Sequence, residues 1–216
     1  MKTLIALAAA LLFNLCAQAQ PKVYFTKEIS PEALVRIYKA LGKEAKGRVA
    51  VKISTGEAGG NNYLKPTLIR NLVDEVGGTI VECNTAYAGS RNTSEAHWKT
   101  IHEHGFDSIF AVDIMDEYGD IRIPVKDKKH IKYDIVGAHL ANYDFMINLA
   151  HFKGHAMGGF GGVLKNQSIG VASSAGSKAK RHAEYQHDSN QFFHCSFLLL
   201  ILMCYEPSGF LIWLVE

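Results

Sequence analysis

The middle of the chain alternates between the hydrophobic period of a strand and that of a helix. Residues 48–54 alternate apolar and polar side chains, which predicts a β-strand. Residues 64–76 repeat apolar side chains every three or four positions and are followed by Gly77, which predicts an amphipathic helix with a glycine stop. The same patterns predict strands at 23–25, 79–85, 109–114 and 145–151, and helices at 30–41, 94–105 and 138–143.

This alternation predicts an α/β fold with a largely parallel sheet that carries helices on both faces. Two further apolar runs, at 121–125 and 130–136, flank a charged turn and predict an edge β-hairpin. In sheets of this class, ligands bind at the carboxyl ends of the strands. The loops after the predicted strands are therefore where we expect the chemistry.

The N-terminus has the three-part pattern of a secretory signal peptide. Lys2 precedes a short apolar run, and the small residues Ala17 and Ala19 suit a cleavage site. Cys16 suggests a lipoprotein instead, but the Leu15 before it is bulky where lipoprotein processing favours a small residue. We therefore expect residues 1–19 to be removed from an exported, periplasmic protein, and residues 20–177 to form its α/β domain.

Residues 178–216 form a tail with a polar start and two apolar runs, at 192–205 and 210–215. Neither run reaches the ~20 residues that a membrane span needs. Together with the pattern of the middle, this predicts no transmembrane span in the mature body. The apolar runs fit either buried or interfacial strands, or a tail that does not belong to this fold.

Charge and cysteine content exclude several classes of protein. The 23 basic and 21 acidic residues leave a formal net charge of only +2, which argues against a nucleic-acid partner, because binding phosphates needs clustered Lys and Arg. The 4 cysteines include no C-x-x-C pair, so they give neither a zinc motif nor a disulfide framework. Cys83 is the one thiol between residues 20 and 177.

The densest group of candidate functional residues follows the predicted strand 145–151. His151, Lys153 and His155 occupy alternate positions, so an extended chain would point all three side chains the same way. Two imidazoles beside an ammonium favour an anion. A metal is not favoured, because four residues of strand separate the two histidines by ~13 Å unless the chain turns at Gly154.

A glycine-rich segment comes next and leads to Lys165 and Asn166. Gly161 and Gly162 would let backbone N–H groups approach a ligand, and a helix that starts near Gly162 would add its positive end. Neither G-x-G-x-x-G nor the P-loop pattern is present, so no nucleotide is predicted. The alternative interpretation is a glycine-rich turn with solvated Lys and His.

Two other loops, at 57–62 and 84–91, are expected at the same edge of the sheet. Arg91 could grip a carboxylate or phosphate with two parallel hydrogen bonds, in a cleft also lined by Asn84 and Tyr87. The alternative is that turn formation explains these residues.

Three further polar features have structural interpretations. His97 is expected to be a surface or core histidine of a helix, and Cys83 an inert buried thiol. The acidic residues at 113–120 lack the spacing of a calcium loop, so we expect a solvated turn around Gly119.

Four segments carry a family resemblance: N-T-A-Y-A-G-S-R at 84–91, E-H-G-F at 103–106, H-F-K-G-H at 151–155 and G-G-V-L-K-N at 161–166. With them, the region from about residue 49 to 176 resembles the domain of unknown function 362 family. The resemblance implies an α/β domain of redox-associated proteins, in which fuller members carry ferredoxin-like cysteine runs for [4Fe–4S] clusters. The recurring basic positions of the family map here onto Lys153, His155, Lys165 and Asn166.

The resemblance ends near Lys178, and no run of cluster-binding cysteines follows. A cluster takes about four thiolates, so we expect no cofactor in this chain. We hypothesise that the residues after about Lys178 are a frameshifted or truncated end. The alternative is a genuine short variant whose apolar tail fills the core or meets a partner.

These observations predict an exported, redox-associated α/β protein of unknown reaction. It would bind a small anionic ligand with His151, Lys153, His155 and Lys165 and with the amides of the glycine segment, and a redox partner would fit this role. One alternative is an enzyme that uses Lys153 and His155 as acid and base on a carboxylate substrate, with Arg91 or Lys165 as a clamp. Another is a non-catalytic accessory or assembly module.

Overall fold

The computed structural model describes residues 23–175 except 127, 130–131 and 156–158, and the strands 199–205 and 209–215. For residues 153–155, 159–160 and the two C-terminal strands, it describes the backbone. The predicted signal peptide, residues 1–19, lies outside the described residues, and so does the polar start of the tail. Within the described residues, no helix is long and apolar enough to cross a membrane.

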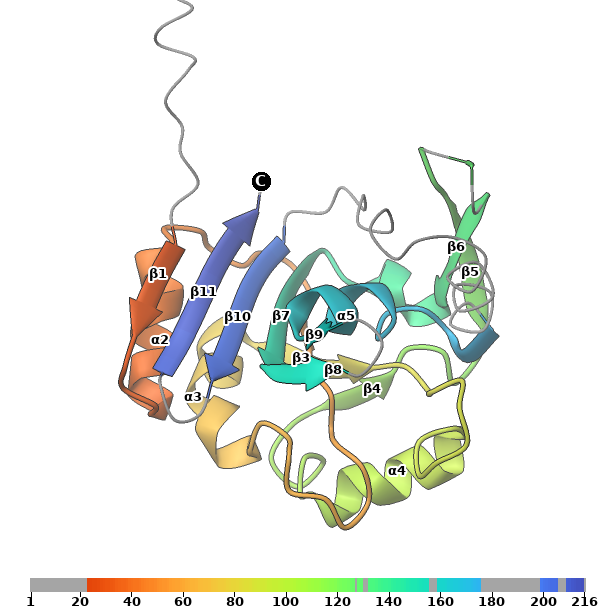
Figure 1. Cartoon of the computed structure of the whole chain (residues 1–216), viewed down its shortest axis with the longest axis horizontal. Coiled ribbons are helices and arrows are strands. Elements are labelled where there is room, and N and C mark those ends of the chain that lie inside the picture. Colours follow the sequence, from red (N-terminus) through yellow and green to blue (C-terminus); the bar gives the residue numbers. More distant parts are fainter. Residues whose placement is uncertain are drawn as a thin grey trace, which may run out of the picture.

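Among the described residues, a 7-stranded sheet has the order β1-β11-β10-β7-β2-β3-β4 (Figure 1). Strands β10, β7, β2, β3 and β4 run parallel to one another, whereas β11 runs antiparallel to both β10 and β1. Residues 199–205 and 209–215, from the two apolar runs of the tail, thus form strands of this sheet. The bounds are β1 Val23–Thr26, β2 Val49–Lys52, β3 Gly78–Glu82, β4 Val112–Ile114, β7 Phe145–His151, β10 Leu199–Tyr205 and β11 Gly209–Val215.

Three amphipathic helices cover one face of the sheet: α2 (Pro31–Ala40), α3 (Pro66–Val76) and α4 (Ser94–Glu103). Their apolar stripes pack against alternate residues of the central strands, because side chains at alternate positions of a strand point to the same face. The resulting core includes Leu34, Ile37, Ile69, Leu72 and Ile101 from the helices and Val49, Val51, Ile53, Ile80 and Ile147 from the strands.

Smaller elements cover the opposite face. They are the 3₁₀ helix η1 (Ala138–Asn142), helix α5 (Val163–Ser168) and a hairpin of β5 (Asp120–Pro124) and β6 (Tyr133–Gly137). A second core lies on this face and includes Ala50, Val81, Cys83, Met115 and Val136. Figure 1 shows α5 in front of β7, with α2 and α3 behind the sheet. The predicted α/β fold, a largely parallel sheet with helices on both faces, is confirmed.

Two details differ from the sequence prediction. The hairpin forms a two-stranded sheet of its own instead of an edge of the main sheet. The run 109–114 is a strand only from Val112, because the N–H groups of Ile109 and Phe110 bond to the carbonyl of Phe106, at 3.1 and 2.9 Å, in a turn that extends helix α4. A short apolar run does not tell a buried turn from a buried strand by its period alone.

Local signals set the helix ends where the sequence predicts them. Ser30 precedes α2 and accepts a hydrogen bond from the Ala33 N–H at 3.1 Å, and Thr93 does the same for the Ala96 N–H of α4 at 3.3 Å. Helix α3 ends at Gly77, whose φ of +56° is a left-handed conformation that favours glycine.

We expect Ser30→Ala to lower the free energy of unfolding by about 1 kcal/mol, because the Ala33 N–H loses its acceptor. Urea denaturation followed by circular dichroism measures this change. Ser30→Thr is the matched control, since threonine keeps the capping hydroxyl. An unchanged urea midpoint for Ser30→Ala would contradict the capping role of Ser30.

Candidate functional site

The order of the strands creates a switch point between β2 and β7. From β2 the chain continues through α3 to β3 on one side, whereas β7 lies on the other side of β2. Lys52, the last residue of β2, lies opposite Asn148 of β7 in the register. The loops that follow β2, β3 and β7 therefore leave the sheet at neighbouring places, which is where ligands bind in this class of fold.

Lys52 is a buried cation at this switch point, with 0% of its surface exposed. Its Nζ donates to the Ile53 carbonyl and, at 2.9 Å, to Oδ1 of Asn166. Burial lowers the pKa of Lys52, and the nearby Glu82 carboxylate opposes that shift. Gly170 leaves room for the ammonium, because a Cβ there would lie 2.8 Å from Nζ.

Asn166 of α5 connects the helix to both strands of the switch point. Its Nδ2 donates to Asn148 Oδ1 at 2.6 Å, to the Lys52 carbonyl at 3.1 Å and to the Leu149 carbonyl at 3.2 Å. Asn148 in turn donates to the Val163 carbonyl at 3.0 Å. The amide of Asn166, which the sequence places in the ligand site, is thus hydrogen-bonded within the chain and positions α5.

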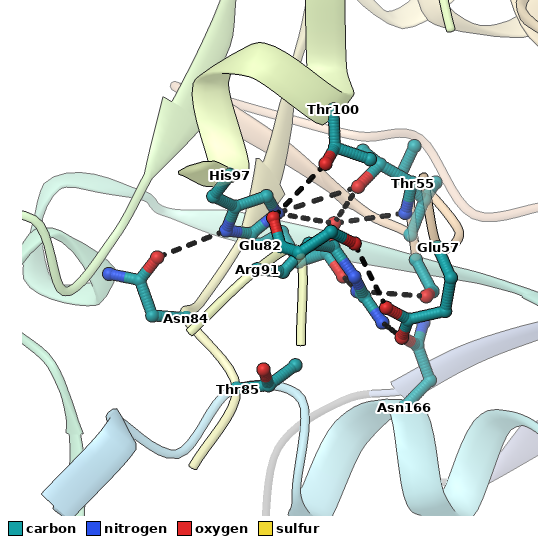
Figure 2. Close-up of polar contacts among 12 residues, drawn as sticks. Thr55, Glu57, Glu82, Asn84, Thr85, Arg91, His97, Thr100 and Asn166 are labelled. Carbon is teal, nitrogen blue, oxygen red and sulfur yellow. Dashed lines mark hydrogen bonds and ion pairs between the residues drawn. The ribbon is translucent and has the colours of Figure 1, made fainter. Parts of the chain in front are cut away.

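Glu82 is the centre of a second network (Figure 2). Alternation along β2 and β3 puts it on the opposite face of the sheet from Lys52. Glu82 ends β3 with 3% of its surface exposed. One oxygen pairs with Arg91 Nη1, and the other lies 3.1 Å from Nε2 of His97 and accepts from Thr55 Oγ1 at 2.7 Å. Burial alone would raise the pKa of Glu82, but Arg91 and His97 outweigh it and hold that pKa well below its ordinary value.

Arg91 links Glu82 to the loop after β2. Its Nη2 contacts Glu57 Oε1 at 2.5 Å, and Glu57 also accepts from Tyr87 and Ser90, at 3.3 and 3.1 Å. At the other end of the network, Asn84 Oδ1 lies 3.1 Å from Nδ1 of His97 (Figure 2). The structure therefore brings together Asn84, Tyr87 and Arg91, which the sequence assigned to one cleft. Both carboxylates that pair with Arg91, those of Glu57 and Glu82, belong to this chain.

The basic residues predicted after β7 lie on three neighbouring elements. His151 ends β7, and Lys153 and His155 bound β8 (Lys153–His155), which pairs antiparallel with β9 (Gly159–Gly161). Gly161 lies opposite Lys153 in this register. The side chains of Lys153 and His155 lie outside the described part of the chain, so their predicted common direction stays a prediction.

The helix that the sequence predicts near Gly162 is present. Gly162 precedes α5, which begins at Val163 and carries Lys165 and Asn166. Lys165 is half-buried, like His151 at the end of β7. The topology thus places both ends of the segment 151–166 beside the switch point.

Sequence reasoning missed Lys52, Glu82 and Thr55. The one signal was that Lys52 and Glu82 each interrupt an otherwise apolar strand at its carboxyl end, where a charged side chain is rarely buried without a partner. His97, expected as a surface or core histidine, is a core residue with 0% of its surface exposed. Cys83 is buried as expected, and burial raises the pKa of its thiol.

The prediction of a solvated turn at 113–120 is wrong for two of its acidic residues, Asp113 and Asp116. Asp116 accepts hydrogen bonds from the backbone N–H groups of Asn84 and Ser174, at 2.8 and 3.0 Å. Asp113 accepts from the Tyr143 hydroxyl at 2.8 Å and lies 2.8 Å from Nδ1 of His139. Both carboxylates hold elements together, because backbone and hydroxyl donors from distant segments converge on them.

The described side chains do not fit an iron–sulfur cluster. A cluster takes about four thiolates. Cys83, the described cysteine, is buried and donates to the Val171 carbonyl at 3.3 Å. No group of three or more His, Cys, Asp and Glu among the described residues could hold a metal ion. No step of the function proposed below passes through a cluster.

Glu82→Gln is expected to lower the free energy of unfolding at neutral pH by roughly 3–5 kcal/mol, because the buried Arg91 loses its buried counter-charge and keeps only the half-exposed Glu57. Since the folded pKa of Glu82 is depressed below the ordinary value of 4.5, its stabilisation is complete above that pH and is lost as the pH falls further. The variant should therefore show a flatter decline of stability between about pH 5 and about pH 3.

Urea denaturation across this pH range measures both effects. Glu103→Gln, at an exposed position of α4, is the matched control and should behave like the wild type. Equal slopes for wild type and Glu82→Gln would mean that Glu82 is not the group that loses its charge.

No curated protein matches the sequence. The family model described as Domain of unknown function (DUF362) matches residues 49–212. The match covers β2, β3, β4, β7 and the loops of the candidate site. It also runs to residue 212 in the apolar tail, so the expectation that the resemblance ends near Lys178 is wrong. Because this range is well over half of the 216 residues, the chain belongs to the DUF362 family, as its sequence segments predict.

Proposed function

We propose that this protein binds a small anionic ligand at the switch point between β2 and β7. One observation carries the proposal: the segment 151–166 contains His151, Lys153, His155 and Lys165 and no Asp or Glu, and it begins at the carboxyl end of β7. Its other end is joined to the buried Lys52 through Asn166, at 2.9 Å. This basic segment thus begins and ends beside the place where the fold class binds its ligands.

The electrostatics of the edge support an anion. The nearest carboxylates in the described networks, Glu57 and Glu82, already pair with Arg91. Lys52 is fully buried, so it would act on a ligand through its charge rather than by contact. A charge acts more strongly across the protein interior than across water, because the interior has the lower dielectric constant.

The proposal includes export and a redox partner. It is supported by the secretory pattern of residues 1–19 and by the redox association that the family resemblance implies. Two other functions remain to be distinguished from simple binding. Catalysis by Lys153 and His155 would convert a carboxylate substrate, and an assembly module would keep its partner complex when both residues are replaced.

The test is isothermal titration of the full chain with inorganic phosphate and pyrophosphate. We expect the double variant Lys153→Ala/His155→Ala to bind at least about ten times more weakly, because it removes a charge and a donor from the site. The control pair Lys128→Ala/His102→Ala removes the same residue types from exposed positions and should leave the affinity unchanged. Thermal unfolding shows that each variant is folded.

Two outcomes would overturn the proposal. One is that the folded double variant binds both anions as tightly as the wild type does. The other is that the wild type binds neither anion.

A further inference from the structure

Three side chains of the loop after β3 hold a carboxylate on both of its oxygens. Arg91 Nη2, at 2.5 Å, and the Tyr87 hydroxyl, at 3.3 Å, reach Oε1 of Glu57, while the Ser90 hydroxyl donates to Oε2 at 3.1 Å. A guanidinium and two hydroxyls that converge on a planar acceptor are the groups with which proteins recognise carboxylates. The three donors lie within residues 87–91, so one loop presents them all.

The donor side of this site is held firmly by the core. The Arg91 side chain is only 7% exposed, and its Nη1 bonds to the buried Glu82 and, at 3.3 Å, to Ser54 Oγ. The Ser90 carbonyl accepts from Thr100 Oγ1 at 3.1 Å, and the Thr85 N–H bonds to the Arg91 carbonyl at 2.7 Å. Donors fixed in this way bind an acceptor at a lower entropic cost than mobile ones do.

Glu57, whose carboxylate occupies the site, is held differently from the three donors. The Glu57 side chain is 50% exposed, and it belongs to a glycine-rich loop in which Gly56 and Gly59 have φ values of +89° and +69°. A Cβ at Gly59 would meet nothing within 4 Å, and the loop is tied to the receptor side through the Ala58 N–H, which donates to Ser90 Oγ at 3.1 Å. Tyr87 is also 45% exposed. A competing carboxylate from solution can therefore reach the site without opening the core.

Charge favours an ionised carboxylate at this place. Burial acts against ionisation of Glu57, but the hydrogen bonds from Arg91, Ser90 and Tyr87 outweigh it and lower the pKa of Glu57. Arg91 Nε is buried and has no hydrogen-bond partner among the described residues, so the guanidinium relies on its two outer nitrogens. Without an anion at Glu57's position, Arg91 Nη2 would lose its charge partner, which is costly for a buried cation.

We propose that Tyr87, Ser90 and Arg91 form a receptor for the carboxylate of a small organic acid, and that Glu57 fills it as an exchangeable internal ligand. The receptor lies in the loop after β3 and uses none of the residues 151–166. It therefore goes beyond the anion site proposed above and does not depend on it. The alternative is that the ion pair between Arg91 and Glu57 only connects the loops after β2 and β3.

The test is isothermal titration calorimetry of the full chain with succinate. Glu57→Ala should bind succinate at least about ten times more tightly than the wild type, because a tethered carboxylate competes at an effective concentration in the millimolar range. Adding Tyr87→Phe should weaken this binding again, because it removes one donor at an exposed position. Glu103→Ala, at an exposed site of α4, should bind like the wild type.

Three results would overturn the receptor. The first is a folded Glu57→Ala variant that gains no affinity for succinate, which would leave Glu57 as a tie between loops. The second is a gain that Tyr87→Phe does not reduce. The third is a gain that disappears when Lys153 and His155 are replaced, because succinate would then bind at residues 151–166. Should Glu57→Ala unfold, Glu57→Gln serves in its place, since its amide oxygen can still accept the loop's hydrogen bonds.

The two sites fail separately. Failure of phosphate and pyrophosphate to bind refutes the site at 151–166 and leaves the succinate result of Glu57→Ala intact. Failure of succinate refutes the receptor and leaves the phosphate result intact.

Discussion

The buried ion pair between Glu82 and Arg91 is the interaction on which this edge of the protein depends. Removing either charge alone deprives the other, which stays buried, of its buried counter-charge, and this is far more costly than losing a surface ion pair. The pair also fixes its surroundings: Glu82 holds Thr55 and His97, and Arg91 holds Glu57. Strand β3, helix α4 and the loops after β2 and β3 are thereby joined at one place.

Alternation along neighbouring strands divides this chemistry between the two faces of the sheet. Glu82 shares a face with Ile80 and meets His97 of α4, whereas Lys52 shares a face with Ala50 and meets α5. Each charge is then satisfied by its own set of partners, ionic for Glu82 and neutral amide and carbonyl groups for Lys52. Both lie at the carboxyl ends of strands, where their opposite charges stabilise each other.

The match between prediction and structure is best where one local signal decides the outcome. Strand β7 has the predicted bounds, because its apolar run begins and ends beside polar turns. Helices α2 and α3 follow from their apolar stripes and from Ser30 and Gly77. Prediction fails where a distant contact decides, as where Asp116 bonds to Asn84 and Ser174. It also fails where an apolar run fits a strand and a buried turn equally well, as at Ile109 and Phe110. The sequence also grouped Asn84, Tyr87 and Arg91, but not Glu82, on which they depend.

By itself, the sequence determined the period of each element, hence the α/β class, and the basic, acid-free segment 151–166 after the last strand of the middle. It also determined the family, through short segments whose residues are read directly. Only the tertiary structure decided which charges meet. Lys52, Glu82 and Arg91 come together through strand order, register and the crossing of α4 over the sheet, and each joins residues far apart in the chain. A local pattern shows that a charge interrupts a strand, but its partner is set by which strand lies beside it.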